Sequence, residues 1–229
     1  MSNKQITGFD TDDTLWENEV FFRRAQMKFI ELHPYIKDPE EMILQIEKEN
    51  IKFYGYGIKG FVLSLLEASV RYSNNQPDFQ KIDKIIKIGK DMLAQTIQLL
   101  PEVEETLRHL SEHNTLIMIT KGDLLDQQRK VEKSGLLKYF SSIEIVSEKD
   151  EQTYLEILEK YDISPKDFLM VGNSLKSDVL PVRKIGGTGV YIPHKLTWKH
   201  EEVDRTFDLE RVVELKTISA LKIWLKNQI

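Results

Sequence analysis

The stretch Lys4-Gln5-Ile6-Thr7-Gly8-Phe9-Asp10-Thr11-Asp12-Asp13-Thr14-Leu15-Trp16 places three carboxylates close together directly after a short alternation of apolar and polar residues. That alternation, from Ile6 to Phe9, predicts a β-strand. Because strand side chains alternate between two faces, Asp10 and Asp12 would project to the same side if the extended backbone continued. Two neighbouring carboxylates repel each other, and a divalent cation or a proton would remove the conflict. The pattern is equally compatible with a polar turn that closes the strand and caps a helix.

The composition indicates a soluble, intracellular protein. The length of 229 residues suits one large domain or two unequal ones. A net charge of −5 argues against a nucleic-acid-binding or anionic-membrane surface. The absence of cysteine excludes disulfides, thiolate metal sites and cysteine nucleophiles. The N-terminus lacks the apolar run of a signal peptide, and no stretch has membrane-spanning length, so we expect a cytoplasmic protein.

A helical block follows Trp16 directly. Apolar residues recur at spacings near three and four in successive segments up to about Ile97, which predicts four helices packed as a small bundle. We therefore predict a helical-bundle domain over residues 16–97, inserted into a second domain made of residues 1–15 and 98–229. Within the insertion, the loop Tyr54 to Gly60 holds three glycines and Lys59. Lys59 could meet an anion there, or it could lie in the first turn of the next helix.

Helices and strands alternate from Leu99 onward. Short apolar runs predict strands at 116–119, 143–146, 168–171 and 190–192, with a weaker candidate at Val212-Val213 and a final helix through Trp224. Such units predict an α/β fold, a Rossmann-like parallel sheet with helices on both faces. In such sheets functional groups gather beyond the carboxyl ends of the strands.

Four predicted strands end in polar clusters. These are Asp10 to Thr14, Thr120 to Asp123, Lys149, and Asn173 to Asp178. Together they supply carboxylates, a hydroxyl and a lysine, which are the groups that bind metal ions and phosphate.

With these clusters in order, the sequence resembles the haloacid dehalogenase superfamily of aspartate-nucleophile hydrolases. Residues 10–14 match its first motif, Asp-x-Asp-x-Thr, and Thr120 matches the second, a Ser or Thr that ends an apolar strand. Lys149 is the best match to the third. Residues 173–178 resemble the fourth, in which the family has an Asp where this chain has Asn173. The helical insertion looks like the family's C1-type cap.

The resemblance implies roles for the matching residues. Asp10 would be the nucleophile that forms an aspartyl-phosphate, and Asp12 would protonate the leaving oxygen and then activate water. Thr120 and Lys149 would bind the transferring oxygens. Mg²⁺ would be held by the Asp10 carboxylate, the Asp12 main-chain carbonyl and the Asp178 carboxylate.

The remaining candidates are less closely tied to the motifs. Asn173 could bind the metal by its amide oxygen or through a water, but it brings no charge. For substrate contacts we predict Thr14, Lys121, Gly122 and Lys59, with Thr14 also holding the loop. Asp13 is expected to be a turn residue, and Asp123 either touches substrate or starts a helix. The five histidines show no spacing typical of a metal site, and core or surface positions are expected for them.

The implied activity is a Mg²⁺-dependent phosphomonoesterase that hydrolyses a small phosphorylated metabolite, similar to phosphoglycolate phosphatases or nucleotidases. A sugar phosphomutase of the same superfamily stays open as an alternative. So does a non-catalytic ligand-binding or regulatory relative, because of Asn173. Dehalogenases and phosphonatases of the superfamily lack a carboxylate at the position of Asp12. The oligomeric state, monomer or homodimer, does not follow from the sequence.

Overall fold

The structure is a computed structural model that describes residues 6–73, 76, 78–201 and 212–227. Its sheet contains β1 (Ile6–Phe9), β2 (Thr115–Lys121), β3 (Ser142–Val146), β4 (Phe168–Gly172), β5 (Thr188–Tyr191) and β6 (Val213–Glu214). The strand order is β3-β2-β1-β4-β5-β6, and every neighbouring pair is parallel. The weak strand candidate at Val212-Val213 is therefore a strand, shifted by one residue to Val213–Glu214.

Helices cover both faces of this sheet. The helices are α5 (Val103–His113), α6 (Leu124–Ser134), α7 (Glu151–Lys160), α8 (Leu180–Lys184) and α9 (Ala220–Lys226). Successive residues of β2 pack on opposite faces of the sheet. Leu116 and Met118 belong to the apolar cluster with α5, α6 and α9, whereas Ile117 and Ile119 belong to the cluster with α7 and α8. Fully apolar strands are expected where both faces are buried. The predicted α/β fold is confirmed.

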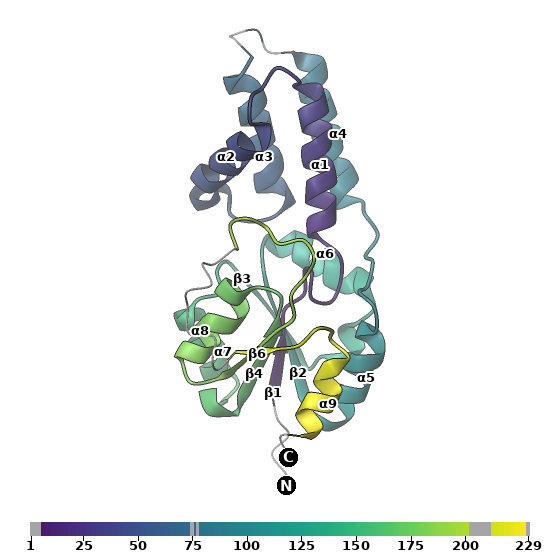
Figure 1. Cartoon of the computed structure of the whole chain (residues 1–229), viewed down its shortest axis with the longest axis vertical. Helices are drawn as coiled ribbons and strands as arrows, with labels where there is room; N and C mark the ends of the chain where they lie inside the picture. Colours follow the sequence, from purple (N-terminus) through teal and green to yellow (C-terminus); the bar gives the residue numbers. More distant parts are fainter. Residues whose placement is uncertain (1–5, 74–75, 77, 202–211, 228–229) are drawn as a thin grey trace.

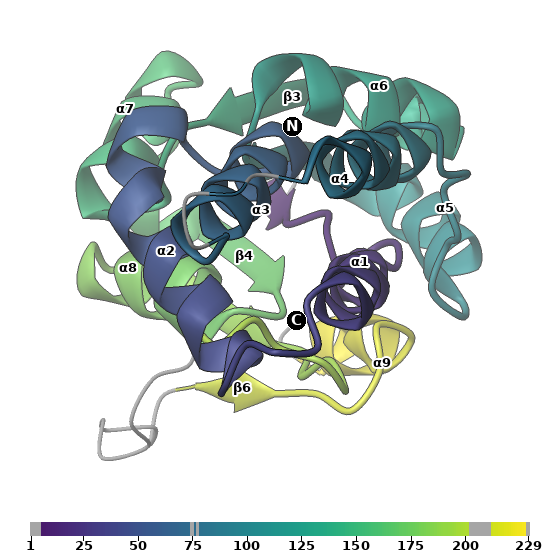
Figure 2. The same cartoon turned by 90° about the horizontal axis from the view of Figure 1, so that it is seen from above.

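The inserted segment forms α1 (Glu19–Leu32), α2 (Pro39–Tyr54), α3 (Ile58–Arg71) and α4 (Phe79–Leu93). These helices stand above the sheet in Figure 1, and Figure 2 looks down onto them. They pack around an apolar cluster of their own, which includes Phe29, Leu65 and Ile85. We refer to α1–α4 as the cap.

Two connecting segments join the cap to the sheet, and they lie side by side. Trp16 and Leu99 form an antiparallel bridge, and the amide of Glu17 donates to the carbonyl of Gln98 at 2.9 Å. The fourth cap helix was expected to reach about Ile97, but it ends at Leu93, because the following residues extend to pair with the other connection. The domain boundaries at 15/16 and 97/98 stay a prediction, which the separate apolar clusters support.

The topology brings the polar clusters together. β1 lies between β2 and β4, with Phe9 in register with Met118 on one side and Val171 on the other. Residues that follow these strands therefore emerge at one edge of the sheet, at the point where the chain reverses its direction of winding. In the described part of the chain, no helix has the length and apolar character needed to cross a membrane.

Candidate active site

The loop after β1 is fixed by its own side chains. Thr14 Oγ1 donates to Asp10 Oδ2 at 2.9 Å. Asp13 adopts a left-handed backbone conformation with φ of 61°, and its carboxylate accepts hydrogen bonds from the amides of Asn18 and Glu19. Asp13 is thus a turn residue, as predicted, and its carboxylate stabilises the turn that leads into α1.

Lys149 joins two carboxylates from different strands. Its Nζ atom lies 2.6 Å from Asp10 Oδ1 and 2.8 Å from Asp178 Oδ1, and all three residues are buried. Burial raises the pKa of Asp10 to about 7, against the opposing effect of the Lys149 ammonium. Burial alone would lower the pKa of Lys149, but the two carboxylates outweigh it and hold that pKa above its usual value. The ammonium is therefore charged at neutral pH.

The carboxylate of Asp178 can lie against the end of β4 because that strand ends in a glycine, Gly172. A Cβ atom at Gly172 would lie 2.1 Å from Asp178 Oδ2, which is far inside contact distance. Asp178 Oδ2 accepts a hydrogen bond from the amide of Ser174 at 2.9 Å. On the other side of β1, Thr120 Oγ1 lies 2.7 Å from Thr11 Oγ1, and Thr120 is buried at the end of β2. Asp10, Lys149 and Asp178 are thus in direct contact, and Thr120 lines the same cavity.

Asn173 approaches the oxygens at which the metal ion is expected. One atom of its side-chain amide lies 3.2 Å from Asp10 Oδ2 and 3.1 Å from both Thr14 Oγ1 and the main-chain oxygen of Asp12. If that atom is the nitrogen, it donates to these oxygens without a metal. If it is the oxygen, it lies from each of these three oxygens at about the 3 Å that separates neighbouring ligands around Mg²⁺. The carboxylates of Asp10 and Asp178 and the main-chain carbonyl of Asp12 offer oxygen atoms, which are the ligands that a hard divalent cation prefers.

Asp12 has partners that the sequence did not point to. Its carboxylate accepts hydrogen bonds from Trp16 Nε1 at 2.7 Å and Gln127 Nε2 at 2.9 Å, and Lys130 Nζ lies 2.9 Å from Asp12 Oδ2. Burial alone would raise the pKa of Asp12, but Lys130 and these donors outweigh it and keep the pKa below its usual value. Asp12 is therefore ionised in this arrangement. In the sequence, the feature that could have indicated these partners is the spacing of Gln127 and Lys130, which places both on one face of α6.

The other residues predicted to contact substrate differ in their positions and in their hydrogen-bond partners. Lys121 faces the site, but its Nζ atom is held by Glu201 at 2.7 Å and Ser177 at 3.1 Å. Lys59 lies in the first turn of α3 and pairs with Asp123 at 2.9 Å, which links the cap to the start of α6. The amide of Gly122 donates to the carbonyl of Val146 at 3.2 Å and so is engaged within the sheet.

A cavity of about 190 Å³ connects these groups with the cap. Asp10, Asp12, Thr120, Lys149, Asn173 and Asp178 line it from the sheet side, and residues of α1, α2 and α3 line it from the cap side. Thr14, Lys59 and Gly122 are not among the lining residues, whereas Lys121 is. The cavity has room for a small leaving group next to Asp10.

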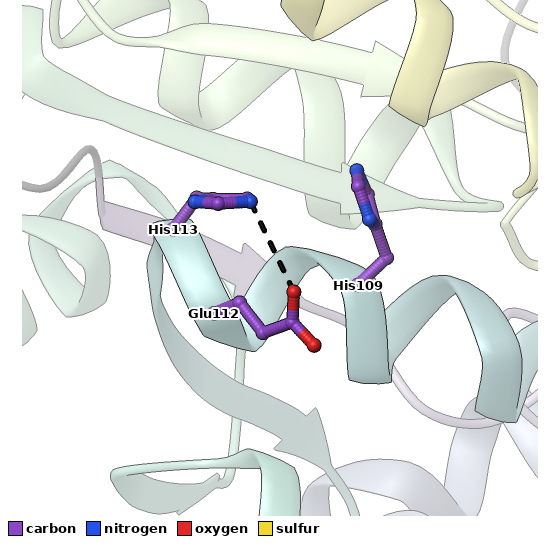
Figure 3. Close-up of side chains that lie close together, drawn as sticks. All are labelled: His109, Glu112 and His113. Atoms are coloured by element: carbon purple, nitrogen blue, oxygen red, sulfur yellow. Dashed lines mark ion pairs between the residues drawn. The ribbon is translucent and has the colours of Figure 1, made fainter.

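The histidines occupy core and surface positions. His33 is buried in the cap and contacts the carbonyl of Phe29 and the hydroxyl of Ser69, both at 3.0 Å. In Figure 3, His109 and His113 project from α5 with Glu112 between them; the three side chains offer ligand atoms within 4.8 Å of one another, but this helix face is largely exposed. A second group of possible ligands consists of Asp13, Glu17 and His194, of which Asp13 belongs to the turn after β1. Neither group faces the cavity around Asp10 as a unit.

Residues 8–186 match the family model described as haloacid dehalogenase-like hydrolase. The chain belongs to this family. The expected enzyme class, a hydrolase of the phosphatase type, is confirmed by this match and by the phosphatases among the relatives.

Individual relatives show how widely the fold is shared. A haloacid dehalogenase-like family hydrolase from Xanthomonas campestris has 35% identity and a TM-score of 0.86, covering 97% of this chain and 91% of that one. The N-acylneuraminate-9-phosphatase of Mus musculus is 24% identical over 193 residues, which is 78% of each chain. A 2-haloacid dehalogenase from Pseudomonas syringae shares the fold, with a TM-score of 0.63 at 21% identity over 98% of this chain and 99% of that one.

Proposed function

We propose that the chain is a Mg²⁺-dependent phosphomonoesterase that hydrolyses a small phosphorylated metabolite through an aspartyl-phosphate on Asp10. The observation that carries the proposal is the buried Lys149 ammonium between Asp10 Oδ1 and Asp178 Oδ1, at 2.6 and 2.8 Å. A buried cation next to a nucleophilic carboxylate lowers the energy of a transferring phosphoryl group, whose oxygens carry the developing charge.

The residues have separate tasks in this proposal. Asp10 attacks phosphorus, while Thr120 and Lys149 bind the oxygens of the phosphoryl group. Asp10, the main-chain carbonyl of Asp12, and Asp178 would hold Mg²⁺, with Asn173 as a further oxygen ligand or as a donor beside it. When bound, the ion would neutralise charge on the phosphate oxygens.

Asp12 handles the proton in both steps. Because Lys130 lies 2.9 Å from its carboxylate and keeps it ionised, Asp12 must leave this contact and take up a proton before it can protonate a leaving oxygen. In the second step the ionised carboxylate is the form that removes a proton from water. The arrangement with Lys130 therefore suits the hydrolytic step.

Asp12 also separates this proposal from dehalogenation. The fold is shared with a haloacid dehalogenase, so the fold alone does not decide the reaction. A carboxylate at the position of Asp12 serves an oxygen leaving group, which needs a proton, whereas a halide leaves without one. The name of the mouse relative, a phosphatase acting at position 9 of an N-acylneuraminate, supports a phosphorylated small molecule as the substrate class.

A screen of phosphate esters and 2-haloacids with Mg²⁺ tests the proposal. We expect phosphate release that requires Mg²⁺ and is abolished by Asp10→Asn, while halide release is absent. Asp150→Asn is the matched control, because Asp150 is exposed beside Lys149 and its side chain caps α7. Phosphate release that survives Asp10→Asn, or halide release by the wild-type chain, would overturn the proposal.

A further inference from the structure

The cap end of the cavity is acidic. Among the described residues that line it from the cap helices, Glu19 comes from α1, Glu40 and Glu47 come from α2, and Arg23 is the only basic one. At the sheet end three lysines have partners: Lys149 pairs with Asp10 and Asp178, Lys121 with Glu201, and Lys130 with Asp12. Lys199 also lines the cavity, from outside the cap helices. On the cap helices themselves, three carboxyl groups thus face one guanidinium.

Two of these carboxyl groups differ in their partners: Glu19 is paired with an arginine, whereas Glu47 has no partner among the described residues. Glu19 is 8% exposed, and its contact is with Arg23 Nε, 3.2 Å from Glu19 Oε1. Arg23 Nε makes no hydrogen bond within the described residues, so this ion pair is poorly aligned. For Glu47, no ion pair or hydrogen bond is found in the part of the chain that the structure describes. A carboxylate can only accept hydrogen bonds, and one that faces a cavity without donors can be satisfied by a ligand that brings them.

The surroundings keep water from solvating these groups fully. Phe22, Leu44 and Phe61 line the same cavity between them. Burial raises the pKa of Glu19 to about 7, with Asp13 adding to the effect, and burial together with Glu19 raises the pKa of Glu47 to about 8. A cationic ligand group would favour the ionised form of both carboxyl groups, whereas an anionic ligand group would be repelled by that ionised form.

We propose that Glu19 and Glu47 make the cap end of the cavity selective for phosphate esters whose leaving group carries an ammonium group, with neutral hydroxyl-bearing esters next and carboxylate-bearing esters last. This inference rests on the proposed phosphomonoesterase activity and names the leaving-group class for the same site. Specificity follows as much from rejection as from attraction, since a carboxylate placed beside the ionised Glu47 gains no donor and is repelled.

Three esters of equal length test the order. They are 2-aminoethyl phosphate, 2-hydroxyethyl phosphate and phosphoglycolate, which differ in one terminal group. We measure kcat/KM for each with Mg²⁺ at pH 9, above the pKa of about 7 of Glu19 and the pKa of about 8 of Glu47, and take the Ki against p-nitrophenyl phosphate for any ester that turns over slowly. We expect the amino ester to exceed the carboxylate ester by roughly tenfold to a hundredfold, with the hydroxyl ester between them.

Glu47→Gln keeps the size of the side chain and removes its charge. We expect it to lower kcat/KM for the amino ester, to raise it for phosphoglycolate, and so to flatten the order. Glu41→Gln is the matched control, because Glu41 lies on the same helix but is exposed and does not line the cavity. Glu41→Gln should keep the order of the wild-type chain.

The outcomes separate the two claims. Hydrolysis of p-nitrophenyl phosphate with a flat or reversed order of the three esters would overturn the leaving-group inference and keep the phosphatase. An order that is unchanged in Glu47→Gln would also overturn it. No hydrolysis of any ester, p-nitrophenyl phosphate included, would overturn the phosphomonoesterase and the inference with it.

Discussion

Replacing Lys149 by methionine would remove the charge that holds the two strand-end carboxylates together. Lys149 is 3% exposed, and its Nζ atom lies 2.6 Å from Asp10 Oδ1 and 2.8 Å from Asp178 Oδ1. Methionine has a similar length and fills the same space without charge. The variant therefore leaves two buried carboxylates that face each other with no cation.

The size of the effect follows from this geometry. Removing one partner of a buried ion pair costs about 3–5 kcal/mol. Because burial already raises the pKa of Asp10 to about 7, the variant can relieve part of the repulsion by protonating Asp10. We therefore expect the free energy of unfolding without Mg²⁺ to fall by about 3 kcal/mol, at the lower end of that range. For a chain of this length, that corresponds to a fall in Tm of roughly 6–12 °C.

Urea unfolding and thermal unfolding, each with EDTA and with excess Mg²⁺, measure this prediction. Mg²⁺ between the two carboxylates should restore part of the lost stability, so the variant should gain more from Mg²⁺ than the wild-type chain does. We expect kcat to fall roughly 10²–10³-fold, since a preorganised charge at the phosphoryl group is lost. Lys138→Met removes an exposed pair with Glu104 and should change stability by no more than about 1 kcal/mol. A Lys149→Met variant as stable as the wild-type chain in EDTA, or one with unchanged kcat, would refute the reasoning.

Two further predictions follow from the same residues. Asn173→Asp adds a negative charge within about 3 Å of the expected metal ligands, so the Mg²⁺ concentration for half-maximal activity should fall roughly tenfold; an unchanged requirement would show that residue 173 does not contact the ion. Glu47 has a folded-state pKa of about 8, above its ordinary 4.5, so its burial costs stability that grows as the pH rises from the lower value through the higher one. Glu47→Gln should therefore be more stable than the wild-type chain at pH 9 by about 2 kcal/mol but not at pH 5, as urea unfolding at both values would measure; equal differences at the two pH values would contradict the raised pKa.

The sequence predicted those parts of the site that follow strands. Asp10, Thr120 and Asp178 could be placed because apolar runs marked the strands and parallel strands end at one edge of the sheet. Lys149 could be placed near a strand end, but its role came from the resemblance to a family motif, since it follows β3 only after an irregular segment. The contact between Lys149 and both carboxylates depends on how this segment bends back, which no local pattern encodes.

The residues that the sequence did not indicate come from helices. Lys130 contacts Asp12 across 118 positions of sequence, and the contact requires a particular rotation of α6 about its axis. Glu47 of α2 lines the cavity, whereas Glu41 on the same helix does not. Periodicity shows which face of a helix is apolar, but a polar residue at the border of that face can turn to solvent or to a cavity. For Lys59 the sequence left open an anion contact and a place in the first turn of a helix; it lies in the first turn of α3 and pairs with Asp123, which caps α6.

Trapping the covalent intermediate tests the central claim, that Asp10 is the nucleophile, most directly. The chain is mixed with a phosphate ester and Mg²⁺, quenched in acid within one turnover, reduced with borohydride and analysed by peptide mass spectrometry. Borohydride converts an aspartyl-phosphate to homoserine, so we predict homoserine at residue 10, and none in a sample without substrate. Turnover with no modification of Asp10, or with homoserine at Asp12 instead, would contradict the account.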